Sequence, residues 1–190
     1  MTELSPPPRG DTIDAQAAIE PLSIDDLSDV RATHHAAIAS SSGPFLTDHE
    51  LAAYRATINS SAYADALATA IYEQRLYGAK ADGFIIGTCG WRHAAHVAAT
   101  AQLGWLFVHP VFSDAGFGRR LLSDTELKAI QAGCHRMSAQ VPLAALRFFE
   151  RLGYVVSSQG TQPVDGGLSI PVAHVRKSLV HAGAKNLTRH

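Results

Sequence analysis

The first third of the chain has apolar residues at helical spacing, preceded by a short strand at residues 17–22. Four residues spaced by three or four positions share one helix face: Leu27, Val30, His34 and Ile38. Ser23–Asp26, before this face, has the capping-box spacing typical of helix starts, and Thr47–Glu50 repeats it. We therefore expect two helical regions before the main sheet, the second of them broken near Ser60.

The middle of the chain alternates apolar stretches with turn residues. Three stretches are expected to form strands: residues 71–80, 84–93 and 101–108. Asp82-Gly83 is typical of a hairpin turn, so the first two stretches should pair antiparallel. Gly87 and Gly90 in the second stretch indicate a bulge or a close backbone approach. Pro110 ends the third stretch because it has no N–H to donate to a neighbouring strand.

The segment Asp114–Arg120 contains two glycines and two arginines and lies between the third strand and a helix with an apolar face. A helix N-terminus offers unpaired backbone N–H groups and the positive end of the helix dipole, and glycines allow an anion to approach the backbone. The segment lacks the third glycine and the later acidic residue of a dinucleotide-binding fingerprint, and it lacks the Gly-Lys-Ser/Thr of a P-loop. It is either a structural turn with solvated arginines or a pyrophosphate cradle of another kind.

Composition and length narrow the class of protein. The chain has 190 residues, 46% of them hydrophobic, and we expect a single domain over residues 13–180 with flexible tails at 1–12 and 181–190. Sixteen Lys and Arg against 17 Asp and Glu leave a net charge of -1, which argues against nucleic acid as a partner. No apolar run approaches the length of a membrane span, so we expect no membrane partner.

Two cysteines and a polar start favour a cytoplasmic location. Cys89 and Cys134 have neither the number nor the spacing of a disulfide framework or a metal knuckle, and we expect both to be buried thiols in a reducing compartment. His93 and His96 do not make a complete set of metal ligands, because no Cys, Asp or Glu stands near them to complete it. No metal is therefore expected.

Two blocks of the chain resemble hallmarks of the GNAT superfamily of acyl-CoA-dependent N-acyltransferases. Leu106–Leu122 is similar to that family's fourth strand and acyl-CoA loop, whose pattern is Arg or Gln, two residues, Gly, one residue, and Gly or Ala. Leu146–Tyr154 is similar to its next hallmark, an aromatic pair on a helix followed by Gly and an aromatic residue. Both blocks occur in the right order and at the right separation, and the resemblance runs from about residue 18 to residue 178.

The resemblance implies an α/β (α+β) fold: a mixed, mostly antiparallel sheet of about seven strands with helices on both faces, splayed between strands four and five. Acetyl-CoA, the implied co-substrate, would lie in that split. Strand five would cover residues 135–141, and the last two strands residues 154–159 and 168–178. Pro142 would be the first residue of the helix that carries the aromatic pair.

Site residues follow from the same resemblance. The pantetheine arm would pair with the backbone of Leu106, Phe107 and Val108, and the N–H of Val108 would hold the thioester oxygen as negative charge develops there. The pyrophosphate would rest on Gly116–Arg119. The implied cofactor site also includes Phe149 of the aromatic pair, and its loop part runs over seven consecutive residues: Ser113, Asp114, Ala115, Gly116, Phe117, Gly118 and Arg119.

Three positions depart from the family's usual pattern. Ser113 stands in place of an Arg or Gln that would contact phosphate. Phe149 stands in place of a Tyr that would protonate the departing thiolate, although an apolar helix stripe also accounts for it. Gln102 stands where the family often has a Glu base. His93 is then the candidate base, with His34 or His35 as alternatives; each also fits a purely structural role.

The sequence predicts an N-acetyltransferase that moves an acetyl group from acetyl-CoA to a primary amine of a small molecule or peptide, by direct attack in a ternary complex. The alternative is a catalytically weak or inactive acyl-CoA-binding sensor or partner module, which the three departures favour. The acceptor stays open, because its pocket would be built from the first two helices and the last hairpin. A homodimer is compatible with the resemblance.

Overall fold

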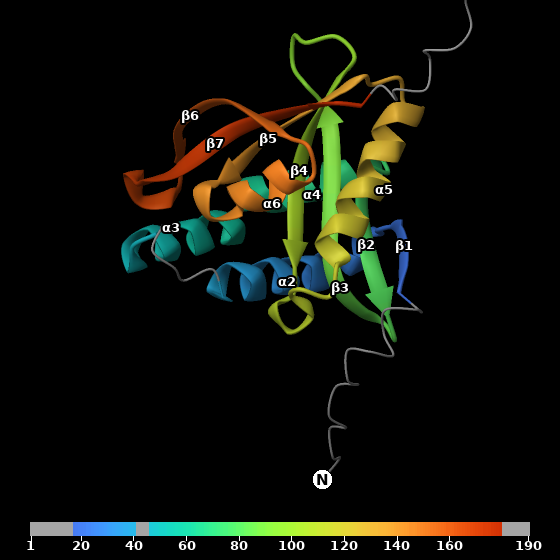
Figure 1. The fold of residues 1–190 in the computed structure, drawn as a ribbon. Helices are drawn as coiled ribbons and strands as arrows, with labels where there is room; N and C mark the ends of the chain where they lie inside the picture. The colour runs from blue at the N-terminus through green and yellow to red at the C-terminus, as the bar shows by residue number, and fades with distance from the viewer. Residues whose placement is uncertain (1–16, 41–45, 180–190) are drawn as a thin grey trace, which may run out of the picture.

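A seven-stranded sheet runs through the molecule with helices packed against it (Figure 1). The computed structural model describes residues 17–40 and 46–179. The strand order is β1-β2-β3-β4-β5-β7-β6, and all neighbouring pairs are antiparallel except β4 and β5. The mixed, mostly antiparallel sheet implied by the resemblance is therefore confirmed.

The elements have the following bounds. The strands are β1 (Ala18–Pro21), β2 (Leu76–Ala81), β3 (Phe84–His93), β4 (Thr100–Val108), β5 (Arg136–Pro142), β6 (Val155–Pro163) and β7 (Ser169–Ser178). The helices are α2 (Leu27–Ser40), α3 (Asp48–Asn59), α4 (Ser61–Tyr72), α5 (Phe117–Gln131) and α6 (Leu146–Arg151). Short 3-10 turns occupy Ile24–Asp26, Pro110–Phe112, Leu143–Ala145 and Asp165–Gly167.

Side-chain caps start the N-terminal helices as the sequence predicts. The Thr47 hydroxyl accepts from the Glu50 N–H at 3.3 Å, and the Glu50 carboxylate accepts from the Thr47 N–H at 2.7 Å. Ser60 separates α3 from α4, and its hydroxyl accepts from the Tyr63 N–H at 3.2 Å. Each cap satisfies N–H groups that have no partner inside the helix, which explains why α3 and α4 are two helices.

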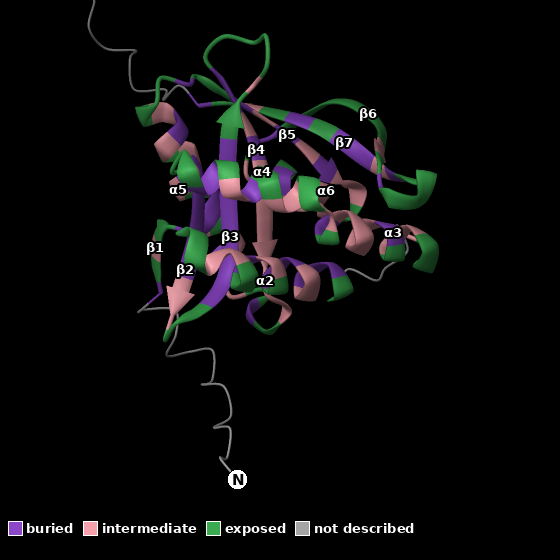
Figure 2. Cartoon of the chain, turned by 180° about the vertical axis from the view of Figure 1, so that it is seen from behind, coloured by how far each residue is buried: buried purple, intermediate pink, exposed green. Residues whose placement is uncertain are grey.

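Alternation along the central strands divides the core between the two faces of the sheet. Ile85 and Ile86 are neighbours in β3, so their side chains point to opposite faces. Ile85 packs with α2 and α4, whereas Ile86 packs with α5. Figure 2 shows β3 buried along most of its length, as expected of a strand covered on both sides. Helices on both faces of the sheet are thus confirmed.

Two expected boundaries are wrong. The strand expected from residue 71 begins at Leu76, because the apolar Ile71 completes the buried face of α4, which runs to Tyr72. Pro142 is the last residue of β5 and not the first residue of a helix; a 3-10 turn follows it and α6 begins at Leu146. The expected tails, residues 13–16 of the expected domain and its last residue lie outside the described residues, so the single-domain boundaries stay a prediction.

The structure agrees with two expectations from the sequence, one on the cysteines and one on the helices. Cys89 and Cys134 are buried and unpaired, as expected. Burial raises the pKa of the Cys89 thiol to about 12, so this group is neutral at physiological pH. Within residues 17–40 and 46–179, the search for a helix of the length and apolarity needed to cross a membrane finds none.

Candidate active site

The sheet splits between β4 and β5. These parallel strands pair only where Thr100–Leu103 meets Arg136–Ala139. Beyond that point β4 stays with β3 and β5 stays with β7, so within the described part of the chain Gly104–Val108 pairs with no strand on the β5 side. The split implied between the fourth and fifth strands is therefore present, and it leaves a free strand edge inside the molecule.

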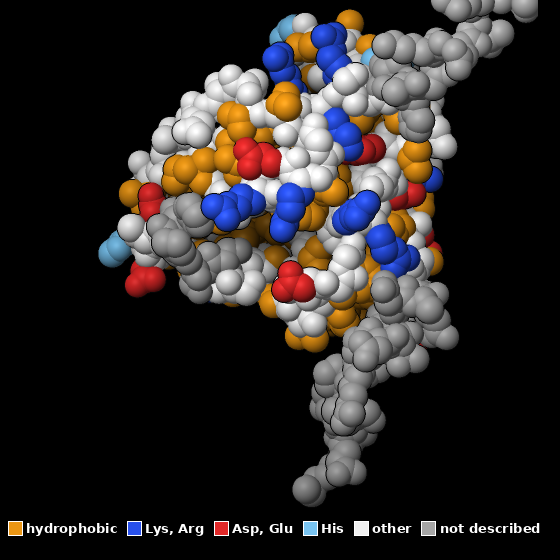
Figure 3. Space-filling model, viewed as in Figure 1, with side chains coloured by type: hydrophobic (Ala, Val, Ile, Leu, Met, Phe, Trp, Pro, Cys, Tyr) orange, Lys and Arg blue, Asp and Glu red, His pale blue; other side chains and the backbone are white. Residues whose placement is uncertain are grey.

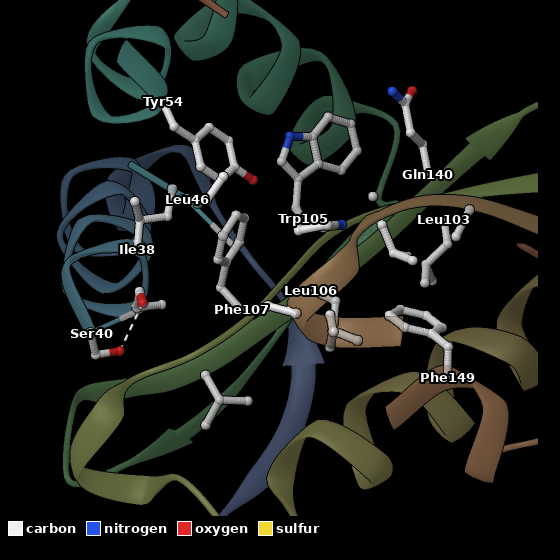
Figure 4. A pocket seen from close by; sticks show the side chains of 18 of the residues that line it. Ile38, Ser40, Leu46, Tyr54, Leu103, Trp105, Leu106, Phe107, Gln140 and Phe149 are labelled. Carbon is white, nitrogen blue, oxygen red and sulfur yellow. Dashed lines mark hydrogen bonds between the residues drawn. The ribbon is translucent and has the colours of Figure 1, made fainter. Parts of the chain in front are cut away.

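A cavity of about 340 Å³ lies at this split and takes its walls from both faces of the sheet (Figure 4). On the face covered by α5 and α6 it is lined by Leu106, Val108 and Phe149. On the opposite face α2 and α3 contribute Ile38 and Tyr54. The cavity therefore has walls on both faces of the sheet.

A bulge in β4 shapes the cavity wall. The pairing of β3 with β4 slips between Thr88 and Gly90, so that Trp105 and Leu106 together stand opposite one residue of β3. Trp105 has a φ of 55°, a left-handed conformation that costs a non-glycine residue roughly 1–2 kcal/mol. The indole of this strained residue lines the cavity.

A chain of buried hydrogen bonds holds the bulge. The Thr88 hydroxyl donates to the Trp105 carbonyl at 2.7 Å, so its oxygen must accept from His34 Nε2, which lies 2.7 Å away. Nδ1 of His34 is then unprotonated and accepts from the Tyr63 hydroxyl at 2.8 Å. The His34 ring also stacks on Phe107, with ring centres 4.2 Å apart.

His34 is neutral in this arrangement. Its side chain is fully buried, and burial, with a smaller contribution from the neighbouring His35, lowers its pKa to about 3. Both ring nitrogens are engaged, and the ring has no route to an acceptor amine. His34 therefore fills a structural role, one of the two that the sequence left open.

The helix after the glycine-rich loop begins without a side-chain cap. Gly116, the residue before α5, has a φ of 82° and offers no side chain to the N–H groups of the first turn. A row of Lys and Arg side chains crosses this face over α6 and the start of α5, beside a hollow (Figure 3). Exposed arginines in these two helices are Arg119, Arg147 and Arg151. Arg120 turns instead toward β1, donating to the Ala17 carbonyl at 3.0 Å.

Several residues expected in the cofactor site share this region. The cavity is lined by Leu106, Phe107, Val108, Ser113 and Phe149. The remaining members occupy the loop and the uncapped first turn that follow Ser113: Asp114, Ala115, Gly116, Phe117, Gly118 and Arg119.

Phe149 belongs to the core and to the cavity wall at once. Its ring is 4% exposed and makes edge-to-face contacts with Phe148 and Tyr154, with ring centres 5.3 and 5.2 Å apart. The Tyr154 hydroxyl is engaged elsewhere, donating to Glu126 Oε1 at 2.9 Å. Figure 4 shows the Phe149 ring reaching from α6 toward Leu106.

The expected base candidate lies outside the cavity. His93 ends β3, where it pairs with Ala101 at the closed end of the β4–β5 pair and contacts Trp91 and Cys134. It is not among the described residues that line the cavity, because the split opens at the other end of β4; its role as a base stays a prediction. Gln102 is also outside, accepting from Arg92 Nε at 3.2 Å.

Tyr54 and Gln140 line the cavity and were not singled out from the sequence. Burial raises the pKa of Tyr54 to about 12, so its hydroxyl stays protonated. Among the described residues this hydroxyl has no hydrogen-bond partner, and Figure 4 shows the ring reaching from α3 toward Trp105 and Phe107. No sequence pattern marks either residue, because each enters the cavity only through the packing of distant elements.

Within residues 17–40 and 46–179, no group of three or more His, Cys, Asp and Glu could hold a metal ion.

Comparison with known proteins identifies the family. Residues 72–156 match a family model described as the acetyltransferase (GNAT) domain, the stretch that contains the split, the loop and the aromatic pair. This match, together with the shared fold, supports membership of the GNAT superfamily. A search of curated proteins finds no match.

Solved structures share the fold at low sequence identity. A GCN5-related N-acetyltransferase of Rhodopseudomonas palustris has a TM-score of 0.75 and 19% identity, over 85% of this chain and 95% of that one. The PaiA N-acetyltransferase of Thermoplasma acidophilum, in complex with coenzyme A, has a TM-score of 0.67 and 19% identity, over 86% and 99%. YncA of Salmonella typhimurium, a putative acetyltransferase with acetyl-CoA, has a TM-score of 0.65 and 17% identity, over 91% and 99%.

Proposed function

We propose that the chain is an N-acetyltransferase that moves an acetyl group from acetyl-CoA to a primary amine by direct attack in a ternary complex. The observation that carries the proposal is the cavity that passes through the split sheet, because it lets a thioester and an amine meet from opposite faces. Holding both reactants at one point supplies a large part of the rate enhancement of such reactions.

The free edge of β4 suits the acyl arm of the co-substrate. The His109 N–H donates to the Ile86 carbonyl of β3 at 2.8 Å. Because successive residues of a strand direct their N–H groups to opposite sides, the N–H of Val108 faces the split. Bound acetyl-CoA would supply the thioester carbonyl there, and the Val108 N–H would stabilise the negative charge that develops on its oxygen.

The phosphates of the co-substrate fit the start of α5. Uncapped N–H groups, the positive end of the helix dipole and exposed Arg119 favour an anion, whereas Asp114 at the rim opposes it. Ser113 replaces a longer side-chain donor. We therefore assign the pyrophosphate to Gly116–Arg119, with backbone amides as its main ligands.

Among the described cavity residues the protonated Tyr54 hydroxyl is the only titratable group, and no carboxylate or imidazole is present to act as a base. An ammonium of pKa near 10 must lose its proton before it attacks, and an apolar cavity favours the neutral amine. The nitrogen then bonds to the carbonyl carbon, the carbon–sulfur bond breaks, CoA leaves as a thiolate, and the amine's second proton passes to water. A thiol of pKa about 8.5 is a tolerable leaving group without an acid.

The second candidate is a weak or inactive acyl-CoA-binding sensor. Three observations favour it: Phe149 has no hydroxyl, the Gln102 side chain accepts from Arg92, and His93 is not among the described residues that line the cavity. Both candidates bind CoA, so binding alone does not separate them.

Calorimetric titration with acetyl-CoA and CoA, together with a thiol-release assay over a panel of amines, separates the candidates. Binding with acceptor-dependent release supports the transferase, and binding without release supports the sensor. Absence of binding would refute both.

Replacing Phe149 by Tyr sharpens this test. The added hydroxyl is expected to raise turnover by about tenfold or more if an acid is what the site lacks. Phe148→Tyr is the matched control, because it adds the same hydroxyl to the neighbouring ring, which packs against Gly118 of α5. Equal effects of the two substitutions would contradict a specific role at position 149.

A further inference from the structure

The half of the cavity on the α2 and α3 face is apolar and aromatic. Its walls are built from Ile38, Leu46, Tyr54, Trp105 and Phe107 (Figure 4). Tyr54 and Leu46 are anchored there because they pack on the apolar cluster that joins α3 to β7. Phe107 is anchored by its stacking on the buried His34 ring. This half is therefore a rigid apolar surface.

No described residue that lines the cavity carries a charge. The polar side-chain groups of the described residues on the α2 and α3 side are uncharged: the Tyr54 hydroxyl, the Gln140 amide, the Trp105 indole N–H and the Ser40 hydroxyl, which already donates to the Ala37 carbonyl at 2.8 Å. A polycation buried here would have no carboxylate to offset its desolvation.

The second observation is the strained backbone conformation of Trp105. At a φ of 55° glycine is strongly favoured, yet this chain carries its largest side chain there and directs it into the cavity wall. The Thr88 hydroxyl, tied to His34, holds the carbonyl of the same residue. Strain maintained by surrounding hydrogen bonds is typical of ligand-contacting positions.

We infer that the acceptor is a primary amine carried on a compact apolar body, preferably a single aromatic ring. The inference rests on the proposed acetyltransferase function and names its substrate class. The ring would lie against Trp105 and Phe107, and the Tyr54 hydroxyl and Gln140 amide would accept hydrogen bonds from the amine. A cavity of about 340 Å³, which also receives the acetyl end of the co-substrate, is small among ligand sites and suits one ring.

The test compares kcat/KM for 2-phenylethylamine, ethanolamine, spermidine and an alanine tripeptide at saturating acetyl-CoA. We expect 2-phenylethylamine to exceed ethanolamine by about 30-fold or more, because burying a ring favours binding by that order. Titration of the same amines into CoA-saturated protein should give the same order of affinity without turnover. Preference for spermidine or the tripeptide would overturn the inference and leave the acetyltransferase standing. If none of the four amines stimulated the release of CoA, the proposed function would be refuted, and the substrate class with it.

Substitutions at position 105 link the preference to this wall. Trp105→Gly removes the indole and relieves the positive φ, so it should lower the ratio of kcat/KM for 2-phenylethylamine to kcat/KM for ethanolamine by about tenfold or more. Trp105→Phe, the matched control, should keep the preference. Leu46→Asp, at a half-buried part of the wall, should raise kcat/KM for spermidine relative to kcat/KM for 2-phenylethylamine. Unchanged selectivity in both Trp105→Gly and Leu46→Asp would overturn the assignment.

Discussion

Lowering the pH from 7.5 to 5 is expected to destabilise the folded protein through His34. The ring is fully buried, and its pKa is lowered to about 3 from an ordinary value of 6.5. Between these two values the unfolded chain binds a proton that the folded protein does not bind. The free energy of unfolding therefore rises with pH across this window, and it falls as the solution is acidified below 6.5.

The magnitude follows from the two pKa values. At pH 5 the unfolded state gains roughly 2 kcal/mol from protonating this side chain, whereas at pH 7.5 it gains almost nothing. The folded state gains nothing at either pH, since its own pKa lies far below both. His34 should thus account for about 2 kcal/mol of the difference in unfolding free energy between the two conditions.

Urea denaturation followed by circular dichroism measures this difference. His34→Gln removes the titration but keeps a side chain that can hydrogen-bond, so the variant should be less stable at pH 7.5 and lose about 2 kcal/mol less on acidification. His35→Gln is the matched control in the same helix; His35 is partly exposed and contacts Asn59 at 2.8 Å. The reasoning is refuted if His34→Gln shows the full pH dependence of the parent protein.

Two further substitutions test the packing around the sheet. Gly87→Ala should cost about 2–3 kcal/mol in guanidinium unfolding, because its Cβ would lie 2.6 Å from the Phe107 carbonyl oxygen; Gly104→Ala, where nothing lies within 4 Å, should cost far less, and equal losses would contradict this. Glu126→Gln should cost about 1–3 kcal/mol, because its carboxylate accepts from Lys177 Nζ at 2.7 and 2.9 Å. A double-mutant cycle with Lys177→Met measures that coupling, and additive losses would show that the pair contributes nothing.

Local patterns in the sequence were sufficient for most elements of the fold. The bounds of β3 and the capped start of α3 follow from alternation and from the Thr47–Glu50 spacing, since each depends on neighbouring residues only. The start of β2 was misplaced because Ile71 suits a strand and a buried helix face equally well. The three consecutive apolar residues Ala70–Tyr72 do not distinguish the two periodicities.

Only those parts of the site that depend on neighbouring residues could be predicted from the sequence. The loop at Gly116 is visible because glycines and arginines are contiguous in sequence. Gly87 and Gly90 indicated an irregularity in this pair of strands, and the register shift lies between them. The conformation of Trp105 could not be predicted, because a large side chain at positive φ goes against local preference and persists only through the distant Thr88 and His34. Tyr54 reaches the cavity only because α3 packs on β7.

The apolar acceptor wall and the missing acid and base are consistent with each other. A carboxylate base would be costly to bury beside Trp105 and Phe107 without a partner, and the described cavity residues offer no cationic partner for it. The same surroundings favour the neutral form of a bound amine, which lessens the need for a base. Chemistry then depends on position: the bulge held by Thr88 sets the course of β4 from Trp105 to Val108, and with it the direction of the N–H proposed to receive the developing charge. Selectivity for apolar amines and modest turnover would therefore have one structural origin.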